Sequence, residues 1–138
     1  MTGTTAQTGA TLAERITAIE RAYEYMLAYA AQGRRSDTEG GVTSGVRDLL
    51  MRANEALDGL MQMSAEDFGV SAAAVGAFAG FVKVLQDDAR RARAVIGIVL
   101  AQPAISSQLI DNLNASIHLR TLLTDLFVVG EAVKSAAA

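Results

Sequence analysis

Residues 71–101 read SAAAVGAFAGFVKVLQDDARRARAVIGIVLA, and this stretch decides the predicted fold. Apolar residues recur through it at alternating steps of four and three: Phe78, Val82, Leu85, Ala89, Ala92, Ile96 and Val99. Such steps place one apolar seam along a helix. The seam passes through the charged segment 86–94 without a slip, and we expect Asp87 to pair with Arg91 there. The pattern predicts one helix of about 45 Å, with two shorter helices broken near Asp87 as the alternative.

The segment before this stretch carries two more helices with a loop between them. Thr11-Leu-Ala-Glu14 has the spacing of a capping box, and an apolar seam follows it to about Gln32. Gly33 suits a left-handed end to that helix. Residues 33–41, GRRSDTEGG, have no period, so we expect the most mobile internal loop there.

The second helix and the fourth helix follow the same four-and-three step. The second is expected to begin near Thr43 or Ser44 and to end near Ser64. The fourth is expected after Pro103, which is the single proline, because a proline fits the first turn of a helix. Its apolar stripe shifts by a residue or two near His118.

Together these patterns predict an all-α fold. Four amphipathic helices with short connections favour an antiparallel, up-down-up-down four-helix bundle, with the two C-terminal helices longer than the others. The 138 residues fit one domain. We expect a single helical-bundle domain over residues 11–134, a disordered N-terminal tail over 1–10 and a frayed C-terminus over 135–138.

Composition excludes several chemistries. The chain has no cysteine, which excludes disulfides, thiolate nucleophiles and cysteine metal sites, and it fits a reducing compartment. Its one histidine has Ala115 three residues before it, so the Glu-x-x-His pairs of di-iron bundles are absent. We therefore expect no catalytic residue, no metal and no cofactor. The first ten residues lack a basic start and an apolar stretch, so we expect no secretory signal and a cytoplasmic protein.

Residues 64–81, SAEDFGVSAAAVGAFAGF, carry the spacing of a helix-turn-helix through Ala65, Gly69 and Val75. The face that would read bases is built of alanine and glycine, apart from one serine, so it offers almost no hydrogen-bonding side chains. We interpret the stretch as a corner between two core helices, with a new N-cap at Ser71. A net charge of −3 also gives no attraction to nucleic acid or to an anionic membrane, and we expect neither as a partner.

Small and apolar residues in the third helix predict contact with a partner. Ala72, Gly76 and Gly80 share one helix face, and small residues let another helix approach closely. Residues 95–100 are apolar nearly all round, so we expect an apolar overhang at that end of the bundle. Self-association would cover the overhang, and a homodimer is the commonest solution. The candidate partner-binding residues are Tyr25, Tyr29, Phe78, Phe81, Ile98, Leu100 and Phe127.

The function predicted from these features is non-enzymatic: self-association and binding of a protein partner, in an adaptor, chaperone-like or regulatory role. The alternative is a bundle that binds a small ligand or catalyses a reaction with Arg90, Arg91 or His118. A helix-turn-helix regulator that binds DNA through residues 64–81 is the third hypothesis. Lys83, Arg90, Arg91 and Arg93 are candidate anion-binding residues, and an ordinary charged helix face is the competing interpretation.

Overall fold

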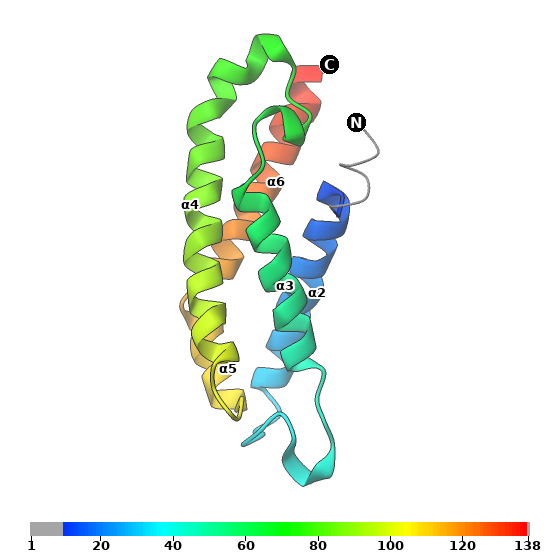
Figure 1. Cartoon of the computed structure of the whole chain (residues 1–138), viewed down its shortest axis with the longest axis vertical. Helices are drawn as coiled ribbons and strands as arrows, with labels where there is room; N and C mark the ends of the chain where they lie inside the picture. The colour runs from blue at the N-terminus through cyan, green and yellow to red at the C-terminus, as the bar shows by residue number, and fades with distance from the viewer. Residues whose placement is uncertain (1–9, 138) are drawn as a thin grey trace.

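The computed structural model describes residues 10–137, which fold entirely into helices and connecting turns (Figure 1). The prediction of an all-α protein is confirmed, and no strand occurs among the described residues. The predicted count of four helices is wrong, because this part of the chain forms five α-helices. They are α2 (Leu12–Ala30), α3 (Val46–Met61), α4 (Val75–Leu100), α5 (Ser107–Ala115) and α6 (His118–Ala137), with short 3-10 turns at η1 (Glu39–Gly41), η2 (Glu66–Phe68) and η3 (Ala72–Ala74).

The two predicted flexible ends, residues 1–10 and 135–138, lie largely or partly outside the described residues. The N-terminal tail over 1–10 lies outside the described residues, apart from Ala10. At the other end α6 runs to Ala137, so the described part of the 135–138 segment belongs to that helix.

The capping box at the start of α2 is confirmed. Thr11 Oγ1 accepts a hydrogen bond from the Glu14 backbone N–H at 3.1 Å, and the Thr11 N–H donates to Glu14 Oε1 at 2.8 Å. These two bonds satisfy amides that have no partner within the helix. The helix itself ends at Ala30, and Gly33 takes the expected left-handed conformation, with φ of 68°, three residues beyond it.

The long helix α4 is continuous through its charged segment, which confirms one helix and excludes a break near Asp87. Its seam is buried as predicted from Val82 to Val99, although Phe78 is only partly buried. The expected pair of Asp87 with Arg91 is wrong. Asp87 forms ion pairs with Lys83 at 3.0 Å and with Arg90 at 2.7 Å, whereas Arg91 forms an ion pair with Asp88 at 2.9 Å.

The predicted fourth helix is interrupted, and α5 and α6 are its two parts. Ile117 lies between them with φ of 60°, a conformation that a β-branched residue rarely adopts. Ser116 turns its hydroxyl back and donates to the Leu113 carbonyl at 2.6 Å, which satisfies an acceptor at the end of α5. The shift of the apolar stripe near His118 marks this break in the sequence.

Neighbouring helices pack along their length around one core. In Figure 1, α2, α3 and α4 lie along the long axis of the molecule, and α6 lies behind them. Helix α3 packs between α2 and α4, α6 packs mainly on α4, and α5 packs on α2. The largest fully buried side chains come from every one of the five helices and from the α4–α5 loop: Ile19, Met26, Tyr29, Leu50, Leu57, Leu60, Leu85, Ile96, Ile105, Ile110 and Leu122.

The predicted apolar overhang at residues 95–100 is wrong. Val95 and Leu100 pack against the core, and Arg47 Nη1 donates to the Leu100 carbonyl at 2.9 Å, so this end of α4 is covered. Only Ile98 stays largely exposed in that segment, at 64%. The helix instead extends beyond α3 at its N-terminal end (Figure 1). Around residues 72–84, by contrast, several apolar side chains of α4 and of the turn before it are exposed to solvent.

Residues 64–74 form a corner, as predicted, and not a helix-turn-helix. Helix α3 ends at Met61. A helix-turn-helix requires its first helix just before Gly69, and the chain forms only the three-residue turn η2 there. Gly69 makes the turn in a left-handed conformation with φ of 90°, while Phe68 and Val70 are buried beside it. The N-cap at Ser71 precedes η3, and its side chain makes no capping hydrogen bond. Within residues 10–137 no helix is both long enough and apolar enough to cross a bilayer.

Candidate interaction surface

Two aspartates fix the register between α4 and α6. The helices run side by side in opposite directions (Figure 1), and the Asp88 carboxylate on α4 lies against the Asp125 carboxyl on α6. In an antiparallel pair of helices, the residue one turn before Asp88 on α4 is level with the residue one turn after Asp125 on α6. Val84 lies one turn before Asp88 on α4, and Val128 lies about one turn after Asp125 on α6. These two side chains are 47% and 50% exposed.

A continuous exposed stripe leads from Val84 toward the start of α4. Its members recur at helical spacing and are all exposed: Ala73, Gly76, Ala77, Gly80 and Val84, with Val128 of α6 at the edge; we name this set the small-residue face. A Cβ atom added at Gly76 or Gly80 would meet nothing within 4 Å. The close helix contact predicted for these glycines is therefore not made by any of residues 10–137.

The small-residue face lacks the groups that usually make a helix surface compatible with water. It has no charged or hydrogen-bonding side chain, and Lys83 beside it is bound to Asp87 at 3.0 Å. Each glycine in a helix costs about 1 kcal/mol relative to alanine. Packing inside this molecule does not offset that cost, so the face has the properties of a contact surface for another molecule.

Of the candidate partner-binding residues, Tyr29 does not lie on the surface of the folded chain. Its side chain is fully buried, and its hydroxyl donates to the Ile105 carbonyl at 2.7 Å. Desolvation by this burial raises the pKa of the Tyr29 hydroxyl. Tyr25 is partly buried, stacks on Tyr29 with ring centroids 6.3 Å apart, and bonds Ser44 at 3.0 Å. Both tyrosines hold α2 to neighbouring segments and leave little surface for a partner.

The structure does not bring the other five candidates together. Phe78 and Phe81 are partly buried in the N-terminal part of α4, next to the small-residue face. Leu100, also partly buried, and Ile98 lie at the opposite end of that helix, about 30 Å away along its axis. Phe127 is 54% exposed on α6.

The candidate anion-binding residues are each matched by a carboxylate. Lys83 and Arg90 share Asp87, Arg91 bonds Asp88 and Arg93 lies 3.8 Å from Asp58. Hydrogen bonds from Arg90 and then Lys83 lower the pKa of Asp87. Arg90 and Arg93 line a cavity of about 340 Å³ with Asn54 of α3 and with Ala94 and Gly97. Arg91 belongs to the α6 side instead, so the four basic residues do not converge on one site.

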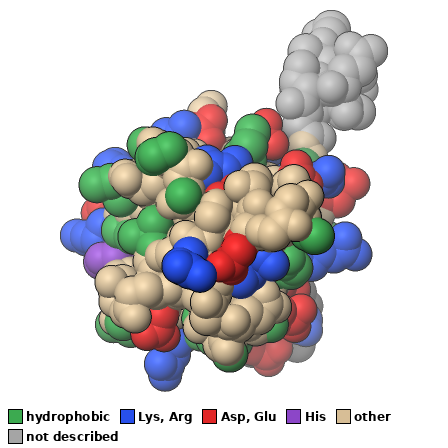
Figure 2. Space-filling model, turned by 90° about the horizontal axis from the view of Figure 1, so that it is seen from below, with side chains coloured by type: hydrophobic (Ala, Val, Ile, Leu, Met, Phe, Trp, Pro, Cys, Tyr) green, Lys and Arg blue, Asp and Glu red, His purple; other side chains and the backbone are tan. Residues whose placement is uncertain are grey.

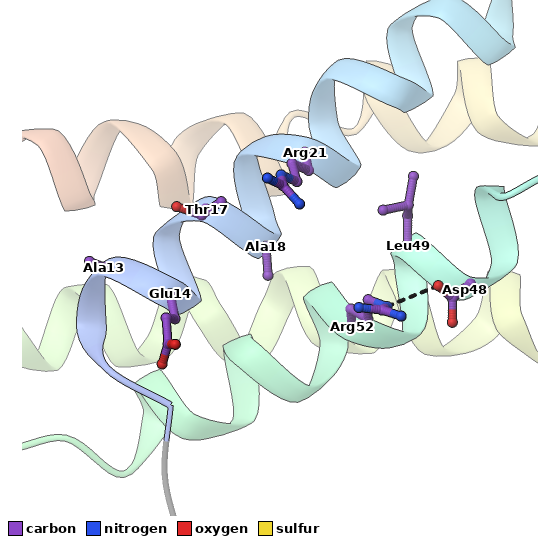
Figure 3. A pocket seen from close by; sticks show the side chains of 8 residues that line it. All are labelled: Ala13, Glu14, Thr17, Ala18, Arg21, Asp48, Leu49 and Arg52. Carbon is purple, nitrogen blue, oxygen red and sulfur yellow. Dashed lines mark hydrogen bonds and ion pairs between the residues drawn. The ribbon is translucent and has the colours of Figure 1, made fainter. Parts of the chain in front are cut away.

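A shallow cavity of about 520 Å³ lies between α2 and α3 (Figure 3). Arg21 of α2 and Arg52 of α3 line it together with Ala13, Thr17 and Ala18 of α2. Arg52 bonds Asp48 at 2.9 Å, and Glu14 is engaged in the capping box. Two arginines and two carboxylates cancel in formal charge, so the cavity has no net attraction for an ion.

Two aspartates, Asp37 and Asp125, lie in contacts between distant segments that the sequence did not indicate. Asp37 comes from the loop predicted to be mobile, yet it is only 3% exposed. Arg47 Nε donates to Asp37 Oδ2 at 2.9 Å, and the Ile105 N–H donates to Asp37 Oδ1 at 2.9 Å. These bonds tie the α2–α3 loop to the α4–α5 loop at Asp37. Figure 2, seen from this end, shows basic and acidic side chains in contact near the centre.

Asp125 is the second missed group. Its Oδ2 atom is buried and has no hydrogen-bond partner among the described residues. Desolvation, followed by the neighbouring Asp88, raises the pKa of Asp125 to about 7. Neither residue stands in a recognisable motif, and their pairing depends on the register of two helices distant in sequence.

Comparison with known proteins places the chain beside none of them: no family model matches it, and neither a curated protein nor a solved structure is significantly similar.

Proposed function

We propose that this chain is a non-enzymatic helical-bundle protein that acts by self-association and by binding a protein partner through the small-residue face. In this proposal α5 and α6 together take the place of the fourth helix of an antiparallel bundle. The observation that carries it is the exposed stripe of glycine, alanine and valine on α4, which no other helix in the described part of the chain covers. An adaptor, chaperone-like or regulatory role follows from such a surface. The cytoplasm is the proposed location, since a chain without cysteine gains nothing from an oxidising compartment.

A second copy of the chain fits this face by symmetry. If two α4 helices cross in opposite directions at Gly80, the Val84 side chain of each copy meets the gap left by Gly76 of the other. Ridges of one helix then enter grooves of the other, and the absence of side chains at the glycines lets the backbones approach. A twofold contact of this kind uses one patch on both subunits.

Charge complementarity supports the same crossing. An opposed pair centred on Gly80 brings Asp87 of one copy to residue 73 of the other, at the start of its α4. The first turn of α4 has no acidic residue and no capping side chain, so its free backbone N–H groups carry partial positive charge. Asp87 therefore meets an oppositely charged helix end in the proposed dimer.

The test of this proposal is sedimentation equilibrium of the Gly80→Glu variant. We expect the wild-type chain to form a dimer and Gly80→Glu to weaken it by at least about tenfold, because a charged side chain fills the close crossing. The monomer should keep its fold, since a Cβ at Gly80 meets nothing and glycine disfavours the helix. Circular dichroism checks this point.

Ala94→Glu is the matched control, because Ala94 is also exposed on α4 but lies about 20 Å from Gly80 along the axis. This variant should dimerise like the wild-type chain. A wild-type chain that stays monomeric at 100 µM or so, or a Gly80→Glu variant that dimerises unchanged, contradicts the proposal.

A further inference from the structure

The contact between α4 and α6 contains two carboxyl groups and one cation. Asp88 bonds Arg91 at 2.9 Å and keeps 15% of its side-chain surface exposed. Asp125 has no such cation, and its Oδ2 atom is buried without a partner in the described part of the chain. Two ionised carboxylates cannot share such a position without strong repulsion. One proton held between them removes that repulsion and supplies the missing hydrogen-bond donor.

The surroundings of Asp125 leave Asp88 as the group that controls its proton. Helix α6 packs on α4, and more lightly on α2, α5 and η2. Burial and Asp88 alone account for the raised pKa of Asp125, so no charged group of α2, α5 or η2 contributes. On α4, Arg91 lies beside the pair through its ion pair with Asp88. On α6 itself, His118 lies two turns away and does not contribute either.

The connection of α6 to the rest of the chain is suited to movement. Ile117 joins it to α5 with φ of 60°, a strained conformation for a β-branched residue. Because α6 packs more on α4 than on any other element, weakening of that contact removes the largest single part of its packing. The hinge and the carboxyl pair therefore act on the same helix.

We propose that Asp88 and Asp125 form a proton-dependent latch that holds α6 on α4 and opens about Ile117 when the shared proton is lost. In the closed state one proton bridges the two carboxyl groups. In the open state both are ionised and hydrated, and Leu122 and Leu126 on the inner face of α6 lose part of their cover. The latch belongs to a single molecule and does not depend on the proposed dimer.

Hydrogen exchange followed by mass spectrometry tests the latch at pH 5.5 and pH 8.5, with rates corrected for intrinsic exchange. In the wild-type chain the protection of α6 peptides should fall about tenfold at the higher pH. Protection of α3 should fall much less, because its contacts are remote from the pair. In Asp125→Asn the α6 difference should disappear, since the amide stays neutral and can donate to Asp88.

Two further variants make the result decisive. Asp88→Asn removes the other charge and should reduce the pH difference in α6 without abolishing it, because burial alone still raises the pKa of Asp125, while Asp111→Asn, an exposed aspartate of α5, should leave the difference intact. Repeating the measurement in the Gly80→Glu background excludes an effect of dimerisation. Equal α6 protection at both pH values in the wild-type chain, or the same pH dependence in Asp125→Asn, overturns the latch.

Discussion

Replacing Asp37 by alanine is expected to lower the free energy of unfolding by about 3 kcal/mol. Asp37 is 3% exposed and accepts hydrogen bonds from Arg47 and from the Ile105 N–H, both at 2.9 Å. Without the carboxylate, the Ile105 N–H is buried with no acceptor, and Arg47 loses its counter-charge. Partial exposure of the Arg47 side chain, at 31%, keeps the expected loss at the lower end of the range for buried pairs.

Arg47 makes this network more than a local pair. Its Nη1 and Nη2 atoms also donate to the carbonyls of Leu100 and Gln102, at 2.9 and 3.0 Å, where α4 ends. A cation at a helix C-terminus stabilises the last carbonyl groups. Loss of Asp37 therefore loosens the position of Arg47 and, through it, the end of the longest helix.

Urea unfolding of Asp37→Ala at pH 7 measures this loss, and Glu39→Ala is its control. Glu39 lies in the same loop but pairs with Arg35, whose side chain is 93% exposed, so its removal should cost less than about 0.5 kcal/mol. The hydrogen bond from Arg47 lowers the pKa of Asp37. Its stabilisation is therefore present above pH 4 and declines as the pH falls through the lowered pKa. A loss for Asp37→Ala no larger than that for Glu39→Ala would contradict this account of the loop.

Replacing Asp125 by asparagine is expected to raise the free energy of unfolding at pH 8 by about 2 kcal/mol. The pKa of Asp125 is about 7 in the folded chain, against 3.8 for an ordinary aspartate. A shift of this size would correspond to about 4 kcal/mol for a carboxyl fully removed from water. Because the residue is partly exposed, solvent screening reduces the effect to about half.

The sign follows from proton binding. Between pH 4 and pH 7 the folded chain holds a proton on Asp125 that the unfolded chain has released, so this residue lowers stability as the pH rises. Below pH 4 both states are protonated and the penalty vanishes. The gain from Asp125→Asn should thus be largest at pH 8 and absent near pH 4.

Urea unfolding at pH 4, 6 and 8 follows this gain, with Asp111→Asn again as the exposed control. The difference between Asp125→Asn and the wild-type chain should grow steadily with pH, while Asp111→Asn shows no such trend. A variant less stable than the wild-type chain at pH 8 would show that Asp125 is ionised and stabilising in the folded state, contrary to its raised pKa.

Regular periodicity made the helices of this chain predictable. The four-and-three step placed the buried seam of α4, because burial of one stripe is what stabilises such a helix. Thr11 and Glu14 were likewise predictable, since a capping box depends only on local spacing. The break at Ile117 was signalled by the shifted stripe near His118, but no glycine or proline marks it, so one continuous helix was the simpler interpretation.

The parts that could not be predicted depend on contacts between distant segments. Asp37 stands in a glycine-rich polar loop that reads as mobile, and its burial follows from partners 10 and 68 residues away. The Asp88–Asp125 contact depends on the register in which α6 packs along α4. Residues 95–100 are apolar nearly all round, and in the folded chain all of them except Ile98 are at least partly buried. This reversed the expected position of the uncovered surface.

Disulfide cross-linking of single-cysteine variants tests most directly whether the small-residue face joins two copies. The chain has no cysteine, so a cysteine at Gly80 is the sole thiol of its variant. In the proposed dimer the two Gly80 positions approach at the crossing, within reach of a disulfide, whereas the two Ala94 positions lie about 40 Å apart. Under mild oxidation we predict that Gly80→Cys becomes a covalent dimer and that Ala94→Cys stays monomeric. Equal cross-linking of the two variants, or none at Gly80→Cys, would contradict self-association through this face.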